Sequence, residues 1–421
     1  MSAVSLSPRP PASSARQVML WIVVFFLGLG LLSFGVHTFT QNNNLGSDYF
    51  IYYVAGRTLF IDHQNPYSDA VATQVQLSVF KRLANPGEDQ VGFAYPPYAF
   101  LPAIPTFWLP FDWGQAIWMA LNLLALMSAI YLAFPRAKKW ATISFLFFFP
   151  VSFALILGNF NILVTSIIIL AYGILTSNQT LARPTQIILG LLLAWATVKP
   201  QFAWLFIGFL LIVSVRKRFW PLLFSFIAGM FVLLAFSFMV MPDWPAAWYE
   251  RLTKYQVYLQ TWLILTFFLK SFLTLNTAEM ITGLAAAACL GISGWFYFQW
   301  WQGNLSNLVL MAWSGLLIFL FHPRGVSYEH ITFLIPLLIW VCSTNPLPRL
   351  AVAIFWFGSL AASWIIFVIS RFPAAPDTVS EWTFFLYVAW FAWLIIPEVT
   401  ENNRSQQKFA RQTISSQKDE R

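Results

Sequence analysis

Long apolar runs without charged residues are the feature that most limits what this chain can fold into. Val18 to Val36, Ala141 to Leu157 and Pro221 to Met241 approach or reach the roughly 20 apolar residues that cross a hydrocarbon core of about 30 Å. Of all residues, 59% are hydrophobic and 10% are charged, against about 25% charged in soluble domains. Because the runs are continuous and do not alternate with polar residues, a transmembrane β-barrel is excluded. The sequence predicts an all-α polytopic membrane protein.

Hydropathy and helix-breaking residues predict about twelve transmembrane helices. They are expected near residues 18–38, 114–134, 140–157, 161–176, 185–198, 202–215, 219–241, 278–298, 305–321, 330–344, 350–370 and 381–396. Several are shorter than a full span, so we expect distorted helices where they line a cavity. The apolar run after residue 17 lacks a small-residue cleavage site, which favours a retained first span over a removed signal peptide.

The distribution of Lys and Arg predicts the orientation. With the N-terminus in the cytoplasm, the inner segments hold 15 of the 24 Lys and Arg residues, as the positive-inside rule requires. We therefore expect cytoplasmic tails at 1–17 and 397–421 around a transmembrane domain at 18–396, with long outer segments at 39–113 and 242–277. The positive net charge is then an orientation signal, and it does not indicate a nucleic-acid partner.

Within the first outer segment, Ala94 to Phe111 is apolar but contains five prolines. Counting it as a span would place the basic cluster Arg136, Lys138 and Lys139 outside. We therefore predict that it forms a membrane-surface helix.

Polar side chains capable of chemistry collect beside the predicted outer segments. Asp48, Lys199, Arg324, Glu329 and His330 stand at span boundaries, and ionisable groups near membrane depth are costly unless they face a cavity. Each also has an ordinary structural explanation. Asp48 could cap the helix that follows it, Lys199 could extend its ammonium toward the headgroups, and the other three could belong to a solvated loop.

An ordered set of short motifs resembles glycosyltransferase family 87, a group of mannosyltransferase-like proteins in the GT-C superfamily. The motifs cover roughly residues 45–340 and comprise Asp48-Tyr49, Tyr52-Tyr53-Val54-Ala55, Asn65-Pro66-Tyr67, Phe93-Ala94-Tyr95-Pro96-Pro97-Tyr98, Gly158-Asn159-Phe160-Asn161, Gly190 with Lys199-Pro200, and Ser327-Tyr328-Glu329-His330. Two features depart from the family pattern. Asn159 stands where the family often has Gln, and the large soluble C-terminal domain of some relatives is missing, which leaves acceptor recognition undefined.

The resemblance implies a GT-C-type bundle whose first outer loop carries surface helices, with a catalytic acid near the start of that loop. Asp48 matches this acidic position. The implied donor is a polyprenyl-phosphate sugar, with mannose favoured and inversion at the anomeric carbon. The implied acceptor is a glycolipid or glycan at the outer face of a bacterial or archaeal cell membrane, in contact with membrane lipid.

The expected chemistry assigns roles to individual residues. Inverting transfer needs one base for the acceptor hydroxyl, which we assign to Asp48, and cations for the departing phosphate, which we assign to Lys199 and Arg324. Further wall or sugar contacts are expected from Tyr95, Asn159, His322, Glu329 and His330. No metal-ligand spacing stands out, so neither a metal nor another cofactor is expected.

Two other classes of protein remain open at this stage. A transporter or lipid flippase of similar size would place polar groups near the midplane on broken helices, often with internal repeats. A structural membrane protein would have no cavity. The collection of polar groups at one membrane face favours the glycosyltransferase.

Overall fold

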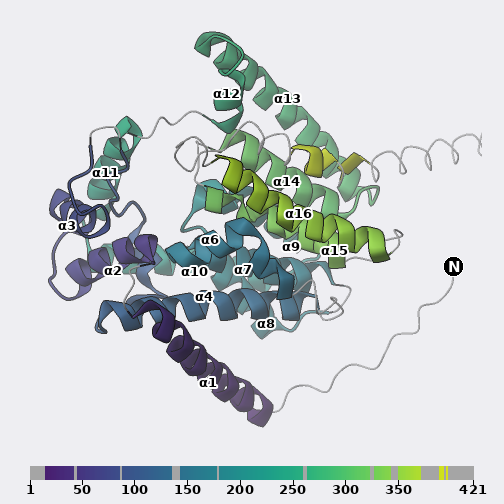
Figure 1. Cartoon of the computed structure of the whole chain (residues 1–421). Coiled ribbons are helices and arrows are strands. Elements are labelled where there is room, and N and C mark those ends of the chain that lie inside the picture. Colours follow the sequence, from purple (N-terminus) through teal and green to yellow (C-terminus); the bar gives the residue numbers. More distant parts are fainter. Residues whose placement is uncertain are drawn as a thin grey trace, which may run out of the picture.

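The computed structural model describes residues 15–41, 45–85, 88–134, 143–177, 180–258, 263–322, 327–342, 349–370, 388–392 and 395–396. Within these ranges the chain is helical and has no β-strand, which confirms the all-α prediction (Figure 1). Residues 1–14 and 397–421 of the predicted tails and Arg324 lie outside the described residues, as does most of the last predicted span, whereas residues 15–17 of the predicted N-terminal tail already belong to the first helix.

The helices follow one another with connections that are mostly short, apart from the longer one between α3 and η1. The α-helices are α1 Ala15–Thr40, α2 Ser47–Phe60, α3 Asp69–Val79, α4 Phe111–Ala133, α6 Phe149–Leu157, α7 Asn161–Thr176, α8 Arg183–Ala196, α9 Pro200–Arg216, α10 Trp220–Val240, α11 Trp244–Tyr258, α12 Ile264–Leu269, α13 Leu275–Trp301, α14 Asn307–Phe321, α15 Leu334–Cys342 and α16 Arg349–Ser370. The 3₁₀ turns are η1 Pro97–Phe100, η2 Ile104–Thr106, η3 Phe145–Phe147 and η4 Ser327–Phe333.

Four of the described helices are long and apolar enough to cross a membrane unaided. Their spanning segments are Val23–Thr40, Phe111–Ala133, Trp220–Val240 and Leu275–Trp301. Five shorter apolar helices are also present, and four of them begin or end at turns that carry polar candidates. Helices α1 and α13 lie at opposite margins of the molecule (Figure 1) and bury only 11% of their spanning windows, as expected for lipid-facing helices.

Small residues allow the central helices to pack closely. A Cβ at Gly190 of α8 would lie 2.0 Å from Oγ of Ser225 and 2.4 Å from the carbonyl oxygen of Leu222, both on α10. A Cβ at Gly173 of α7 would lie 2.4 Å from Cβ of Ala133 on α4. Without a hydrophobic driving force in lipid, such close contact supplies the packing energy between helices.

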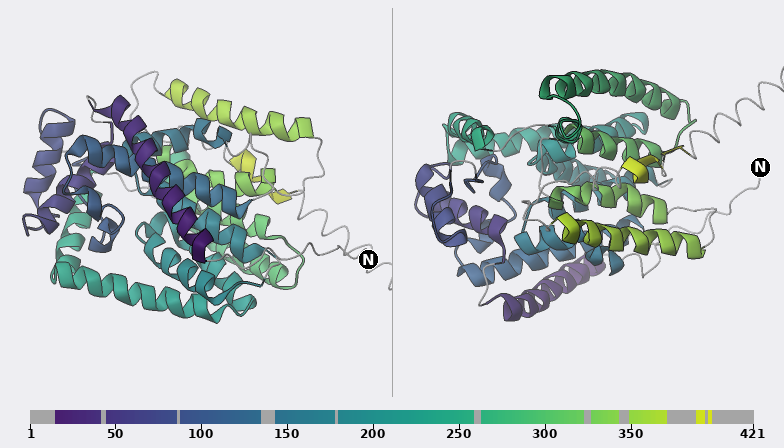
Figure 2. Two further views of the ribbon diagram at one scale, coloured as in Figure 1. Left: turned by 90° about the horizontal axis from the view of Figure 1, so that it is seen from below. Right: turned by 45° about the horizontal axis from the view of Figure 1, so that its top comes forward.

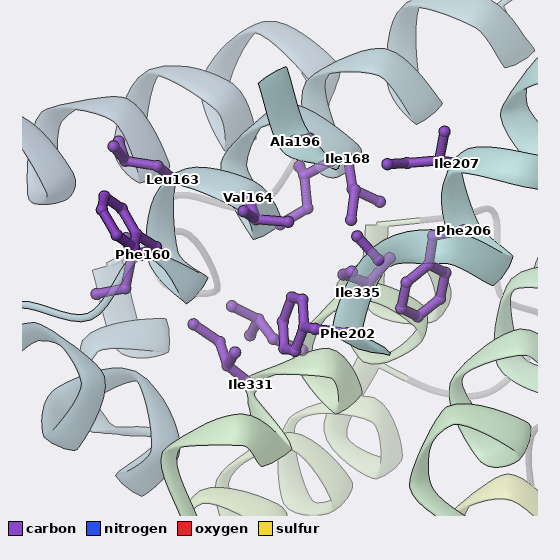
Figure 3. Packing of buried hydrophobic residues seen from close by; sticks show 14 of the residues in the cluster. Phe160, Leu163, Val164, Ile168, Ala196, Phe202, Phe206, Ile207, Ile331 and Ile335 are labelled. Atoms are coloured by element: carbon purple, nitrogen blue, oxygen red, sulfur yellow. The ribbon is translucent and has the colours of Figure 1, made fainter. Parts of the chain in front are cut away.

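The core lies where α7, α8 and α9 meet the segment around α15. Phe160, Val164, Phe202, Ile331 and Ile335 converge there (Figure 3), and each is almost fully buried. Four of the polar candidates, Asn159, Lys199, Glu329 and His330, lie just before α7, α9 or α15, so the apolar core holds their backbones in place.

The predicted first outer segment forms a separate layer at one end of the bundle. Helices α2 and α3 pack against each other there, and α11 lies beside them in all three views (Figures 1 and 2). The indole Nε1 of Trp248 on α11 donates to the carbonyl oxygen of Ala94 at 2.9 Å, and Lys254 pairs with Asp69 at the start of α3 at 3.0 Å. These contacts confirm helices in the loop and fasten the two predicted outer segments to each other.

The predicted surface helix at Ala94 to Phe111 is wrong. The structure has only η1 and η2 there, and Ala99, Phe100, Ala103 and Phe107 are fully buried. Proline lacks the backbone N–H that a continuing helix needs. The repeated prolines break the segment into short turns, and its apolar side chains pack against protein, with Phe107 facing Phe60 at 6.0 Å between ring centroids.

Candidate functional site

Asp48 is the second residue of α2, and the turn before it is anchored from α4. Oε1 of Gln115 accepts the backbone N–H groups of Leu45 at 3.0 Å and Gly46 at 2.7 Å. The residue that caps α2 is Gly46, and no side chain makes a capping hydrogen bond. Asp48 therefore does not cap α2, which was the structural role that the sequence suggested for it.

The side chain of Asp48 is instead held by Asn159. Nδ2 of Asn159 donates to Oδ2 of Asp48 at 2.6 Å, while Oδ1 of Asn159 accepts the backbone N–H of Asn161 at 2.9 Å. Asn159 is 1% exposed. Because its oxygen is fixed by the first residue of α7, its amide nitrogen must face the carboxylate.

Gly158 makes this turn between α6 and α7 possible. It ends α6 in the left-handed conformation with φ of 70°, which glycine adopts at little cost. Its carbonyl oxygen accepts Nε1 of Trp118 at 2.7 Å. A Cβ at this position would lie 2.7 Å from Cβ of Tyr49, so α2, α4 and the turn meet at a point where only glycine fits.

Lys199 forms the second half of the site. It precedes α9, is 2% exposed, and its Nζ lies 2.7 Å from Oε1 of Glu329 on η4. Oε2 of Glu329 lies 3.5 Å from Nδ1 of His322 at the end of α14. The lysine therefore does not extend to the surface. It belongs to a buried row of three ionisable groups from three separate segments.

Electrostatics connect the two halves. The pKa of Asp48 is raised to about 6, chiefly by burial, and the hydrogen bond from Asn159 and the positive charge of Lys199 offset part of that rise. Glu329 and Asp89 act in the opposite direction. A carboxylate whose pKa lies near neutrality, in reach of a buried ammonium, is the arrangement expected of a general base.

Aromatic rings form one wall of the site. Tyr52 stacks on Phe160 with ring centroids 4.1 Å apart, and Tyr95 meets both rings edge-on, at 5.7 Å and 5.3 Å. Tyr95 is near enough to Lys199, Asp48 and Glu329 for their charges to act on its hydroxyl. Sequence reasoning selected Tyr95 but missed Tyr52, Phe160 and Gln115, although Tyr52 and Phe160 stand inside the quoted motifs.

The structure thus brings together most of the residues expected at the site. Asp48, Asn159, Tyr95, Lys199, Glu329 and His322 form the cluster described above. His330 is buried beside it, with its ring packed against Phe319 and Phe333 at 5.6 Å and 6.1 Å. Glu329 is the counterion of Lys199, a role that differs from the sugar contact expected of it. Arg324 lies outside the described residues.

An apolar cavity lies next to the aromatic wall. It has a volume of about 470 Å³ and lies between α4, α7 and α8, with Leu101, Leu121, Ile167 and Trp195 in its lining. Trp195 also faces Phe160, with ring centroids 6.1 Å apart, and donates its Nε1 hydrogen to the carbonyl oxygen of Tyr98 at 3.2 Å. The same indole therefore borders the polar site and the apolar cavity. Neither Asp48 nor Lys199 lines this cavity, which opens among apolar side chains.

The fold and the site define a multi-span membrane protein that carries a partly buried acid and a buried, ion-paired lysine at the ends of its helices. The sequence model of glycosyltransferase family 87 matches residues 93–323, more than half of the chain, and the chain belongs to this family. It is therefore a membrane glycosyltransferase, and its all-helical fold is consistent with the GT-C superfamily. Tyr95, Asn159, Lys199 and His322 lie inside the matched range, whereas Asp48 and Glu329 lie outside it. Neither a curated protein nor a solved structure matches the chain.

Proposed function

We propose that the protein transfers a sugar, with mannose favoured, from a polyprenyl-phosphate donor to an acceptor hydroxyl of a glycolipid or glycan at the outer face of the cell membrane. Within the family, the observation that supports this reaction best is the pairing of Asp48 with Asn159 beside the buried Lys199. It supplies a base of suitable pKa and a cation at the ends of adjoining helices. The proposal retains the predicted bundle of about twelve spans with both termini in the cytoplasm.

The reaction needs one proton acceptor and one stabiliser of the leaving group. Asp48 takes the proton of the acceptor hydroxyl as its oxygen attacks the anomeric carbon, and the bond from that carbon to the phosphate oxygen breaks. The electron pair of that bond leaves with the lipid phosphate. A single displacement inverts the anomeric carbon, so a second carboxylate acting as nucleophile is unnecessary.

Lys199 is the cation that we assign to the donor phosphate. Its ammonium is held by Glu329 at 2.7 Å, so the approaching phosphate competes with that carboxylate. Oε2 of Glu329 already lies 3.5 Å from His322, and the imidazole can take over part of the pairing when Lys199 turns to the phosphate. Arg324 stays a second candidate for this phosphate.

The apolar cavity supports a lipid-linked donor. It lies among spanning helices and shares Trp195 with the aromatic wall of the site. A prenyl chain that enters between α4 and α8 would therefore bring its phosphate toward Lys199. Burial of each prenyl methylene contributes about 0.8 kcal/mol, which would make the affinity depend on lipid length.

A panel of donors tests the proposed function. Purified protein in nanodiscs is incubated with polyprenyl-phosphate mannose, glucose and other hexoses and with a glycolipid acceptor, and the glycosylated product is measured by mass spectrometry. The expected result is transfer from one of these donors and none from the matching nucleotide sugars. Transfer from nucleotide sugars alone would contradict the proposed donor class.

A further inference from the structure

The carboxylate of Asp48 is held in an asymmetric way. Oδ2 accepts the hydrogen bond from Nδ2 of Asn159 at 2.6 Å. No other residue in the described part of the chain donates a hydrogen bond to either oxygen, and the side chain is partly open to solvent. The two oxygens therefore differ, since one is engaged by the protein and the other is open to an incoming group.

We propose that Asn159 is a positioning residue, which holds Oδ2 of Asp48 so that Oδ1 receives the proton of the acceptor hydroxyl. The inference rests on the proposed role of Asp48 as the base. It replaces the sugar contact that the sequence suggested for Asn159.

The geometry of the turn makes Asn159 suited to this task. Its own oxygen is taken by the backbone N–H of Asn161 at 2.9 Å, which prevents the carboxamide from flipping. The left-handed Gly158 and its hydrogen bond to Trp118 at 2.7 Å fix the backbone on the other side. The donor N–H is thus preorganised toward Asp48, and no energy is spent on orienting it during the reaction.

The hydrogen bond also sets the acidity of the base. A donor to the charged form of a carboxyl favours ionisation, so the Asn159 contact offsets part of the rise that burial causes, and the pKa of Asp48 is about 6 with this contact in place. Lys199, Asp89 and Glu329 act on the same carboxyl. All three remain unchanged in the variants below, so a shift in the pH profile reports the contact with Asn159.

The pH dependence of transfer tests this role. Asn159→Ala removes the hydrogen bond to Asp48. We therefore expect the acidic limb of kcat/KM to move upward by about one pH unit, while the affinity for the sugar donor stays unchanged. In Asn159→Asp, the oxygen that accepts from Asn161 is kept but a second carboxyl faces Asp48. Two carboxyls at this distance share one proton, so the limb should move further upward than in Asn159→Ala.

Asn161→Ala is the matched control. It truncates the same side chain two residues away, and neither amide atom of Asn161 has a hydrogen-bond partner among the described residues. The backbone N–H that orients Asn159 is retained. We expect the acidic limb of this variant to stay at its wild-type pH.

The outcomes separate this inference from the proposed function. If Asp48→Asn abolishes transfer but neither Asn159 variant moves the limb, the positioning role is wrong and the base remains. If the Asn159 variants bind the sugar donor more weakly but keep the acidic limb at its wild-type pH, Asn159 contacts the substrate and does not position Asp48. If Asn161→Ala moves the limb as far as the Asn159 variants do, the effect comes from packing of the turn. Normal transfer by Asp48→Asn would show that Asp48 is not the base, and the positioning role of Asn159 would then be wrong as well.

Discussion

The ammonium of Lys199 lies 2.7 Å from Oε1 of Glu329, with the two side chains only 2% and 12% exposed. Charges removed from water in this way depend on each other, because either one alone would stay uncompensated. Lys199, which we assign to the donor phosphate, thus also stabilises the fold through Glu329 on η4. Substitutions must distinguish the effect on donor binding from the effect on stability.

Neutralising one or both members of the Lys199–Glu329 pair separates the structural role of Lys199 from its role in donor binding. Lys199→Gln or Glu329→Gln should each lower the free energy of unfolding by about 3–5 kcal/mol, since each leaves the partner charge buried. The double variant carries no charge there and should recover most of that loss. Donor binding, however, should remain weak in the double variant because no ammonium meets the phosphate.

Thermal unfolding in detergent and binding of a polyprenyl-phosphate sugar measure the two quantities. Single variants as stable as the wild type would show that the ion pair is unimportant for the fold. Wild-type donor affinity in the double variant would remove Lys199 from the phosphate site.

Asp48→Asn separates catalysis from folding. The amide is similar in size but cannot accept a proton near neutral pH, so transfer should fall by at least ~10²-fold. Donor affinity should change little. Single-turnover transfer with radiolabelled donor measures the rate, and near-normal transfer by a well-folded variant would leave the mechanism without a base.

The same variant should not lose stability at neutral pH. Burial raises the pKa of Asp48 in the folded protein to about 6 from its usual 3.8, so the stability linked to this group is present in acid and lost as the pH rises through about 6. At a pH near 7.5 the charged carboxylate is the costlier form, and Asp48→Asn should unfold at the same or a higher temperature. A lower unfolding temperature at that pH would show that the carboxylate contributes contacts beyond those described.

The wild-type pH profile follows from the same pKa. A base must be deprotonated to act, so kcat/KM should be level above about pH 6 and fall about tenfold for each unit below it. The measurement is kcat/KM across buffers of constant ionic strength. A limb near pH 4 would mean that Asp48 titrates as an exposed carboxyl.

Gly158→Ala tests the turn that carries Asn159. A side chain there must adopt φ of 70° and would place Cβ 2.7 Å from Cβ of Tyr49, and the left-handed conformation alone costs roughly 1–2 kcal/mol. We expect lower thermal stability and slower transfer. Gly283→Ala in α13 is the control, because a Cβ there meets nothing within 4 Å, and it should be neutral or stabilising. Equal behaviour of the two variants would contradict the tight turn.

Cysteine labelling tests the predicted orientation. In a Cys289→Ser, Cys342→Ser background, Gln74→Cys on exposed α3 should react with an impermeant maleimide from outside intact cells. Lys217→Cys, in the basic connection between α9 and α10, should react only after the membrane is opened. The reverse pattern would place the site on the cytoplasmic face.

Part of this architecture could be predicted from the sequence because its cause is local. Apolar runs indicate membrane helices, since the bilayer acts on each segment separately. The positions of Lys and Arg add a prediction of their direction, which the labelling experiment tests. The breaks between predicted helices at residues 158–160 and 199–201 were also recognisable from a few neighbouring residues. The surface helix at Ala94 to Phe111 was wrong because composition shows that a segment is apolar, while the repeated prolines and the packing partners decide its shape.

The partners of the polar side chains were decided only by the tertiary structure. Asp48 and Asn159 are 111 residues apart in the chain, and no local pattern shows that a carboxamide would hold the carboxylate and leave the capping position to Gly46. Lys199 and Glu329 likewise meet only in the folded protein, where η4 packs against α6 and α7. Apolar burial along the helices determines which of their ends coincide, and burial at those ends then forces each charged or polar group to find a partner there.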